Sequence, residues 1–278
     1  METAPANFAM HQGTTERQWG FVESVEGYAR HGIRALTVRR SSIEEYGVTK
    51  AAKLISDADL KVLGVSRCAS LTEDDPAKIA KNHDENIRAI ALSAELQATN
   101  LAMISSGLPA DSKDLAGARS RARDAVAKLL PEARAAGVSL ALEAIHPMRA
   151  ASGCVWSTLG QANKVCEELG DGTGLIVDAY HVWWDPDLTA SIEAAKGRIV
   201  SFQISDWLRD TTAADGSDRG MPGDGVIPLR EMGAQVRQAG FDGYDDLELF
   251  SERNWWQRDP DELIDVAIAR HREIFGDD

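Results

Sequence analysis

The sequence predicts a single α/β domain over residues 1–278, in which eight parallel strands alternate with eight helices. Three observations predict this fold. Short apolar runs alternate eight times with longer amphipathic segments, and glycines recur where helices should end. The length of 278 residues also suits a fold that usually needs about 250 residues. Eight strand-then-helix units are the number that closes a (β/α)8 TIM barrel.

The strands are predicted from short runs rich in apolar and β-branched residues. They are expected at Asn7–His11, Ala35–Arg39, Lys61–Ser66, Asn100–Ser105, Ser139–Glu143, Gly174–Asp178, Ile199–Ile204 and Asp245–Leu249. The helices are predicted from amphipathic segments at about residues 20–27, 48–58, 77–96, 114–136, 158–169, 187–196, 229–239 and 260–274.

Helix-ending and helix-starting residues support these boundaries. Five glycines each follow a helical segment and precede a strand, where a left-handed residue commonly ends a helix: Gly32, Gly137, Gly170, Gly197 and Gly240. Asp185-Pro186 and Asp259-Pro260 place a capping side chain before a proline at a helix start. No low-complexity linker divides the chain, so one domain is expected.

Composition and charge restrict the function. The net charge of −14, from 30 Lys plus Arg against 44 Asp plus Glu, argues against a nucleic-acid-binding surface, which needs clustered positive charge. Three cysteines without a CxxC pair indicate neither a disulfide scaffold nor a zinc knuckle. The first ten residues lack a basic start and an apolar core, and no apolar run approaches the ~20 residues of a membrane span. A cytoplasmic protein without a membrane anchor is expected.

One long irregular segment, residues 205–227, follows the seventh strand. Loops longer than about 12–15 residues in a compact domain are usually functional or mobile. Because it leaves the carboxyl end of a strand, this loop is expected to lie over the barrel mouth as part of the substrate site. A plain surface insertion is the alternative.

Four polar residues end four consecutive predicted strands, the fifth to the eighth: Glu143, Asp178, Gln203 and Glu248. The carboxyl ends of barrel strands meet at one mouth, so these side chains should converge. Three carboxylates without a cation would repel one another and take up protons. A divalent metal removes that conflict, and an oxygen-rich set suits Mn²⁺ or Mg²⁺. Helix capping or solvent contact would explain any one of these residues alone, and Gln203 could instead orient a ligand.

Further candidates lie in the segments that follow strands. His146 and His181 come shortly after Glu143 and Asp178, and each could be a ligand, a proton shuttle or a hydrogen-bonding group. Arg219, Trp183, Trp207 and His11 are candidate substrate-binding residues. Flat rings suit the C–H faces of sugars, although aromatic side chains also pack beneath loops.

These motifs resemble the xylose isomerase-like TIM-barrel superfamily, the sugar phosphate isomerase/epimerase group. The resemblance rests on Leu-Glu143-Ala-Ile-His-Pro, Val-Asp178-Ala-Tyr-His181, Phe-Gln203-Ile-Ser-Asp206 and Leu-Glu248-Leu-Phe, and on the Arg219 segment. The first half matches only in its alternation of strands and helices. The resemblance implies that Glu143, Asp178, Gln203 and Glu248 bind one divalent metal, for which Mn²⁺ is preferred and Mg²⁺ or Co²⁺ are open.

One departure from that pattern keeps a second function open. The third ligand position is usually His in the epimerases, and here it is Gln203. Together with His-Pro-Met after Glu143, this resembles the catalytic subunit of bacterial C-glycoside deglycosidases. Those enzymes cleave the carbon–carbon bond of 3-oxo-C-glycosides with a small β-sandwich partner subunit. This resemblance leaves a hetero-oligomer with such a subunit open, alongside a homo-oligomer.

The expected chemistry is proton transfer next to the carbonyl of a keto-sugar, through an enediolate. For an isomerase or epimerase, Glu143 and Glu248 are the expected bases. For a carbon–carbon lyase, His146 is the expected base and His181 polarises a substrate oxygen. If His146 points into the mouth, elimination is favoured. If it points away, an epimerase with the two glutamates as bases is favoured. A non-catalytic carbohydrate-binding barrel is the remaining alternative.

Overall fold

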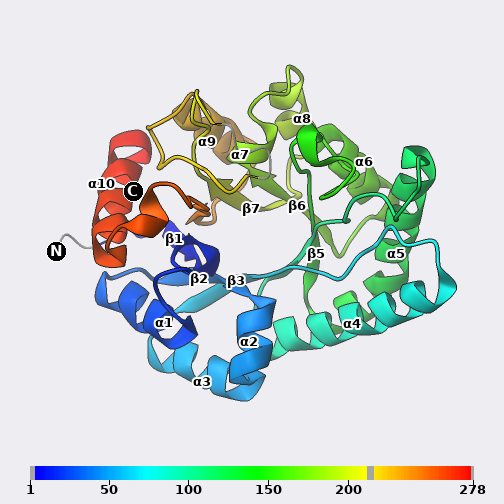
Figure 1. Cartoon of the computed structure of the whole chain (residues 1–278), viewed down its shortest axis with the longest axis horizontal. Helices are drawn as coiled ribbons and strands as arrows, with labels where there is room; N and C mark the ends of the chain where they lie inside the picture. The colour runs from blue at the N-terminus through cyan, green and yellow to red at the C-terminus, as the bar shows by residue number, and fades with distance from the viewer. Residues whose placement is uncertain (1–3, 212–215, 277–278) are drawn as a thin grey trace.

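The computed structural model describes residues 4–211 and 216–276, and within them the chain forms the predicted closed parallel barrel (Figure 1). The strands follow chain order from β1 to β8, and β8 pairs with β1. Their bounds are β1 Phe8–His11, β2 Ala35–Arg39, β3 Lys61–Ser66, β4 Asn100–Met103, β5 Ser139–Glu143, β6 Thr173–Asp178, β7 Ile199–Ile204 and β8 Asp245–Leu247. The (β/α)8 prediction is confirmed.

The helices surround the barrel in Figure 1, as the alternation predicts. They are α1 Phe21–Arg30, α2 Arg40–Tyr46, α3 Val48–Asp57, α4 Pro76–Glu95, α5 Leu115–Ala136, α6 Leu159–Leu169, α7 Ala179–Val182, α8 Leu188–Ala194, α9 Leu229–Gln238 and α10 Pro260–Phe275. Three 3₁₀ turns add η1 Gln12–Thr14, η2 Pro147–Arg149 and η3 Trp255–Gln257. The short helices α2 and α7 were not predicted, because each begins directly after a strand with no turn residue between them.

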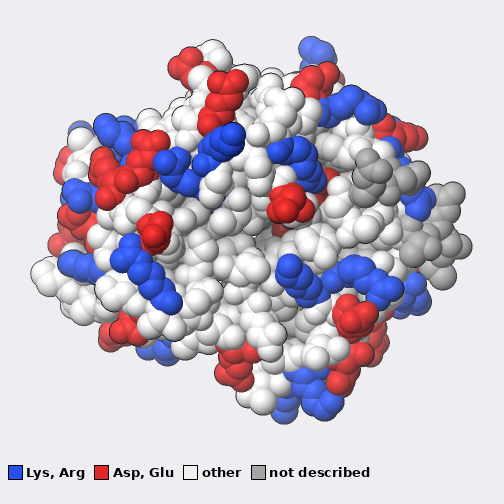
Figure 2. Space-filling view, turned by 180° about the vertical axis from the view of Figure 1, so that it is seen from behind, with Lys and Arg blue, Asp and Glu red and all other residues white. Residues whose placement is uncertain are grey.

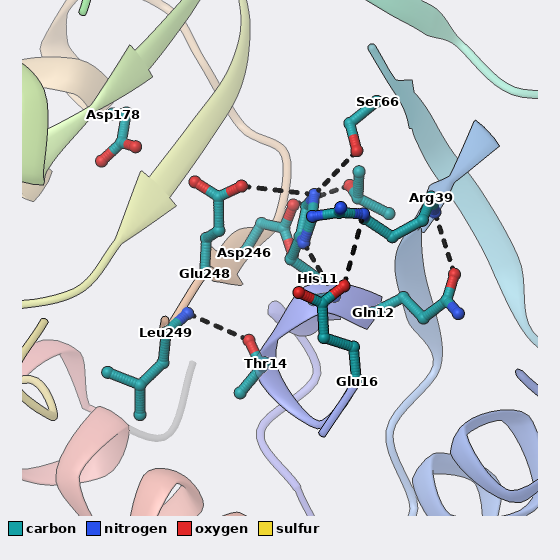
Figure 3. Close-up of polar contacts among 12 residues, drawn as sticks. His11, Gln12, Thr14, Glu16, Arg39, Ser66, Asp178, Asp246, Glu248 and Leu249 are labelled. Atoms are coloured by element: carbon teal, nitrogen blue, oxygen red, sulfur yellow. Dashed lines mark hydrogen bonds and ion pairs between the residues drawn. The ribbon is translucent and has the colours of Figure 1, made fainter. Parts of the chain in front are cut away.

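Two predicted strand ends were wrong by two residues. The fourth strand stops at Met103 rather than Ser105, because Ser106 takes a left-handed φ of 74° and turns the chain toward the loop after β5. The eighth strand stops at Leu247. There the Thr14 hydroxyl donates to the Leu247 carbonyl at 2.7 Å and accepts from the Leu249 amide at 3.0 Å, in place of ladder hydrogen bonds (Figure 3).

The pleat of the strands positions the predicted site residues. A small apolar cluster of Ala102, Ala141 and Ile176, one residue from each of β4, β5 and β6, is separate from the main core. Glu143 follows Ala141 by two positions and Asp178 follows Ile176 by two, so each carboxylate shares a face with its apolar neighbour. The same alternation that fills the barrel therefore directs these carboxylates toward the mouth.

The surface charges are mixed, and no clustered positive charge of the kind that nucleic-acid binding needs is seen on one face (Figure 2). On the face shown in Figure 2, basic and acidic side chains are interspersed and form no large patch of one sign. Within the described residues, no helix combines the length and the apolar character that crossing a bilayer requires.

A single buried carboxylate organises the long loop after β7, of which residues 212–215 lie outside the described structure. The Asp206 side chain is 1% exposed and accepts hydrogen bonds from four backbone amides, of residues 207, 223, 225 and 227, at 2.9–3.0 Å. At Gly225 a Cβ would lie 2.3 Å from the Trp207 carbonyl oxygen, so only glycine fits this approach. Asp206 thereby fixes both ends of the loop that carries Arg219.

We expect Asp206→Asn to lower the free energy of unfolding by about 2–3 kcal/mol, because an amide NH₂ would replace one acceptor and face two backbone donors. Urea denaturation measures the change. Asp242→Asn, at an exposed position, is the matched control and should change stability by less than about 0.5 kcal/mol. A loss no larger in Asp206→Asn than in the control would contradict this role.

Candidate functional site

A cavity of about 270 Å³ opens where the predicted site residues meet. Its lining includes Glu143 from the end of β5, His181 from α7, Arg219 from the loop after β7, and Glu248 directly after β8. These four side chains come from segments up to 105 positions apart in the sequence, so the barrel closure alone brings them together. The convergence of strand ends is the feature that the sequence predicted.

One group of potential ligands lies within the reach of a single ion. Ligand atoms of Glu143, Asp178 and His181 lie within 4.8 Å of one another, and all three residues are buried. Gln203 is also buried, and its side-chain oxygen Oε1 has no hydrogen-bond partner within the described residues. A buried carbonyl oxygen without a donor is costly unless it meets a cation or a bound group. The residues present therefore fit a hard divalent ion.

Arg219 occupies the centre of the carboxylate cluster, which the sequence did not predict. Its side chain is 3% exposed, and its Nη1 contacts Asp178 Oδ2 at 3.0 Å and Glu248 Oε2 at 3.1 Å. Three carboxylates and one guanidinium carry a formal charge of −2, which a divalent cation would balance. The other oxygen of Asp178 accepts from the Tyr180 amide at 2.9 Å, so this residue also caps α7. One oxygen of Asp178 therefore caps a helix, as the alternative explanation proposed, while the other oxygen contacts Arg219.

The surroundings push the carboxyl groups toward their protonated forms. Burial, followed by the negative charges of Glu248 and Asp178, raises the pKa of Glu143 well above its ordinary value. Burial raises the pKa of Glu248 to about 8, although the Arg219 charge opposes that change. A bound divalent cation would reverse both effects, since it favours the ionised forms.

His11, on the neighbouring strand β1, contacts the carboxylate of Glu248, which follows β8 (Figure 3). Its Nδ1 accepts from the Gly13 amide at 3.0 Å, so the proton of the neutral ring lies on Nε2. Nε2 is 3.3 Å from Glu248 Oε1 and 3.2 Å from Ser66 Oγ. Burial, with the Arg39 and Arg219 charges, lowers the pKa of His11 well below its ordinary value, so the ring stays neutral. His11 is therefore placed to orient Glu248.

His181 is neutral for similar reasons. Burial lowers its pKa to about 3, and the nearby Asp178 only partly opposes this. Its Nδ1 is 3.4 Å from the His146 amide, and its Nε2 is 3.2 Å from Arg219 Nη2. Both neighbours are donors, so they disfavour the imidazolium form, which has no acceptor atom.

Three predicted residues gather in an aromatic cluster outside the cavity lining. The His146 ring stacks on Trp207 with centroids 4.8 Å apart, and Trp183 lies 5.8 Å from Trp207. His146 Nδ1 accepts from the Met148 amide at 3.3 Å. His146, Trp183 and Trp207 do not line the cavity, and neither do Asp178, Gln203 and His11, which are buried. Substrate contact by the two tryptophans stays a prediction.

The first half of the chain contributes residues that the motifs did not reveal. Arg39 and Arg40 lie at the end of β2, and Ser66 and Arg67 at the end of β3, and all four line the cavity. Deeper in the barrel, Asp246 is fully buried and accepts from the Thr37 hydroxyl at 2.6 Å. The sequence could have indicated these residues by their positions at strand ends. The first half of the chain carries no matching motif, so their charges alone did not distinguish them from surface residues.

Comparison with known proteins identifies relatives of this chain. Residues 22–273 match the model of the xylose isomerase-like TIM barrel family. An inosose isomerase from Halalkalibacterium halodurans is 29% identical over 144 residues, which is 50% of this chain and 49% of the relative. The alignment thus spans about half the length of that curated relative.

Solved structures share the whole fold. A protein from Sinorhizobium meliloti 1021 is 39% identical, with a TM-score of 0.93 over 97% of this chain and 98% of that one. The IolI protein with a bound zinc atom is 20% identical, with a TM-score of 0.84 over 96% and 97%. A D-psicose 3-epimerase, crystallised in the presence of D-fructose, is 19% identical, with a TM-score of 0.78 over 97% and 99%. At the last two identities the likeness establishes the fold alone.

We expect the affinity for Mn²⁺ to rise with pH between about pH 6 and pH 8, and binding to release protons. The raised pKa values of Glu143 and Glu248 keep these groups partly protonated without an ion, and coordination requires them ionised. Each released proton allows up to about a tenfold gain per pH unit. Isothermal titration calorimetry in buffers of different ionisation enthalpy measures both quantities. Glu252→Gln, an exposed glutamate, is the control, and a pH-independent affinity without proton release would refute the arrangement.

Proposed function

Because the chain belongs to the xylose isomerase-like TIM barrel family, we propose that it is a divalent-metal-dependent sugar isomerase or epimerase. It would transfer a proton next to the carbonyl of a keto-sugar, through an enediolate. The observation that carries this proposal is that Glu143 and Glu248 line one cavity with His181 and Arg219, and that the buried Asp178 contacts Arg219. The half-length similarity to an inosose isomerase supports the same class of reaction.

The proposed metal ligands are Glu143, Asp178, Gln203 and Glu248, with Mn²⁺ preferred because the set is rich in oxygen. The unpartnered oxygen of Gln203 and the net charge of −2 support a divalent ion. The zinc atom of the IolI structure shows that a related barrel binds such an ion. An ion held there would supply Lewis acidity, which makes the C–H next to a chelated carbonyl easier to deprotonate.

The protein's own groups would move the proton. One glutamate removes it from the carbon next to the carbonyl, and the other returns a proton to the opposite face, so the reaction consumes nothing. His11 orients Glu248 through its Nε2 proton and so directs the basic oxygen. Arg219 lines the cavity and would donate to substrate oxygens as negative charge develops, and the neutral His181 lines the cavity beside it.

Two observations favour the glutamate pair over carbon–carbon bond cleavage. His146, the base expected for elimination, stacks on Trp207 and does not line the cavity. The cavity of about 270 Å³ lies just below the ~300–1,000 Å³ of sites for drug-sized ligands, so it suits a single sugar better than a sugar carrying an aromatic aglycone.

We expect the Mn²⁺-loaded protein to exchange deuterium from D₂O into the carbon next to the carbonyl of at least one keto-sugar. Nuclear magnetic resonance of a panel of ketopentoses, ketohexoses and their phosphates and acids measures the exchange. Glu248→Gln should slow it by about a thousandfold, because a base is removed, whereas His146→Gln should change it by less than about threefold.

Metal content, measured on each variant, separates loss of the base from loss of the ion. Exchange that survives in Glu248→Gln but disappears in His146→Gln would favour the eliminase. A protein that binds sugars without exchanging deuterium into any of them would be a carbohydrate-binding barrel.

A further inference from the structure

A second cluster of potential metal ligands joins the first helix to the last. It consists of His31, which directly follows α1, and of Asp261 and Asp265 in α10. The two aspartates are four positions apart, so they share one face of α10. None of the three residues lines the cavity, and the proposed function does not use them.

The hydrogen bond of His31 fixes which ring nitrogen carries the hydrogen. The side chain is 1% exposed, and its Nδ1 lies 2.8 Å from the carbonyl oxygen of Gly27, one turn earlier in α1. Because a carbonyl oxygen only accepts hydrogen bonds, the hydrogen of the neutral ring lies on Nδ1. A carbonyl partner of this kind commonly orients a metal-binding histidine. Nε2 of the neutral ring therefore presents a lone pair.

That lone pair faces two carboxylate oxygens. Nε2 lies 3.4 Å from Asp261 Oδ1 and 3.7 Å from Asp265 Oδ1. The nitrogen is buried and forms no hydrogen bond within the described residues. A lone pair turned toward two carboxylates is repulsive, and the repulsion is strongest where water is excluded. The arrangement therefore requires a cation between the ring and the carboxylates, either a proton on Nε2 or a metal ion.

The distances favour a metal ion over a proton. N–H···O hydrogen bonds span about 2.7–3.2 Å, so both contacts are longer than a shared proton allows. Zinc binds nitrogen at about 2.0–2.1 Å and carboxylate oxygen at about 2.0–2.2 Å, which at tetrahedral angles separates the two ligand atoms by about 3.3–3.5 Å. The contact with Asp261 has this length, and the contact with Asp265 exceeds it only slightly.

The carboxylates can adjust to an ion that arrives from solvent. The side chains of Asp261 and Asp265 are 48% and 55% exposed. Asp265 makes no other side-chain hydrogen bond or ion pair within residues 4–211 and 216–276, so its carboxylate can rotate toward Nε2. The Arg30 guanidinium contacts Asp261 Oδ1 at 2.5 Å and holds that carboxylate beside the ring.

We infer that His31, Asp261 and Asp265 form a binding site for a divalent transition metal, with Zn²⁺ as its representative, that fastens α1 to α10. One imidazole and two carboxylates supply three ligands, and water would complete the tetrahedron. The ion would join the first and last helices of a barrel that closes through β1 and β8. It would therefore stabilise the folded chain. This site is independent of the proposed function.

Zinc binding to the wild type and to two variants tests the inference. Equilibrium dialysis with elemental analysis should find one bound ion fewer per chain in His31→Gln and in Asp265→Ala than in the wild type. At a free Zn²⁺ concentration about tenfold above Kd, the wild-type Tm should rise by about 2–4 °C more than that of either variant. Asp265→Ala changes a half-exposed side chain, so it keeps the test valid where His31→Gln does not fold.

The comparison with the variants removes the contribution of ions bound at the barrel mouth. Two variants are matched controls and should bind as much zinc as the wild type: His83→Gln, on α4, and Asp242→Ala, at an exposed position. Zinc lost only from the His31 and Asp265 variants would support the inference whether or not the mouth binds a metal.

Anomalous diffraction from a crystal grown with Zn²⁺ locates the ion. We expect a peak about 2.0–2.1 Å from His31 Nε2. No peak there, or equal zinc content and Tm shift in the wild type and both variants, would overturn the inference. A metal-free ring that has moved within hydrogen-bonding distance of one carboxylate would overturn it too, since a proton would then be the missing cation.

Discussion

The burial of three carboxylates around one small cavity is the constraint on which the site depends. Glu143, Asp178 and Glu248 end strands that the closed barrel forces together, and one guanidinium, from Arg219, offsets only part of their charge. Such a cluster is unfavourable unless protons or cations enter it. Gln203, paired with Asp178 in the sheet, adds a buried oxygen that has no hydrogen-bond partner among the described residues. The raised pKa values and the fit to a divalent ion follow from this one arrangement.

The rest of the structure maintains that arrangement. Asp206 gathers four backbone amides and so fixes the loop that carries Arg219 into the cluster. His11 uses a backbone amide to fix its own tautomer and presents Nε2 to Glu248. These contacts involve neither reacting carbons nor a metal, yet they determine where the carboxylate oxygens lie. The proposed chemistry therefore depends on hydrogen bonds made by a loop and by the first strand.

Much of the barrel and part of the site could be predicted from the sequence because both follow local rules. Alternation and helix-ending glycines predicted all eight strands, and strand ends predicted Glu143, Asp178, Gln203 and Glu248 as neighbours. The insertion of Arg219 between Asp178 and Glu248 could not be predicted, since it depends on the path of a long loop. The stacking of His146 on Trp207 and the approach of Arg67 to the cavity depend likewise on tertiary packing, which no periodicity reports.

Anomalous diffraction from a crystal soaked with Mn²⁺ tests the central claim most directly. We predict one ion coordinated by oxygens of Glu143, Asp178, Gln203 and Glu248 at about 2.0–2.2 Å, with Asp178 released from Arg219. Absence of an ion from the cavity would contradict a metal site at these residues. An ion bound instead by Glu143, Asp178 and His181, with Gln203 remote from it, would also contradict the proposed ligand set.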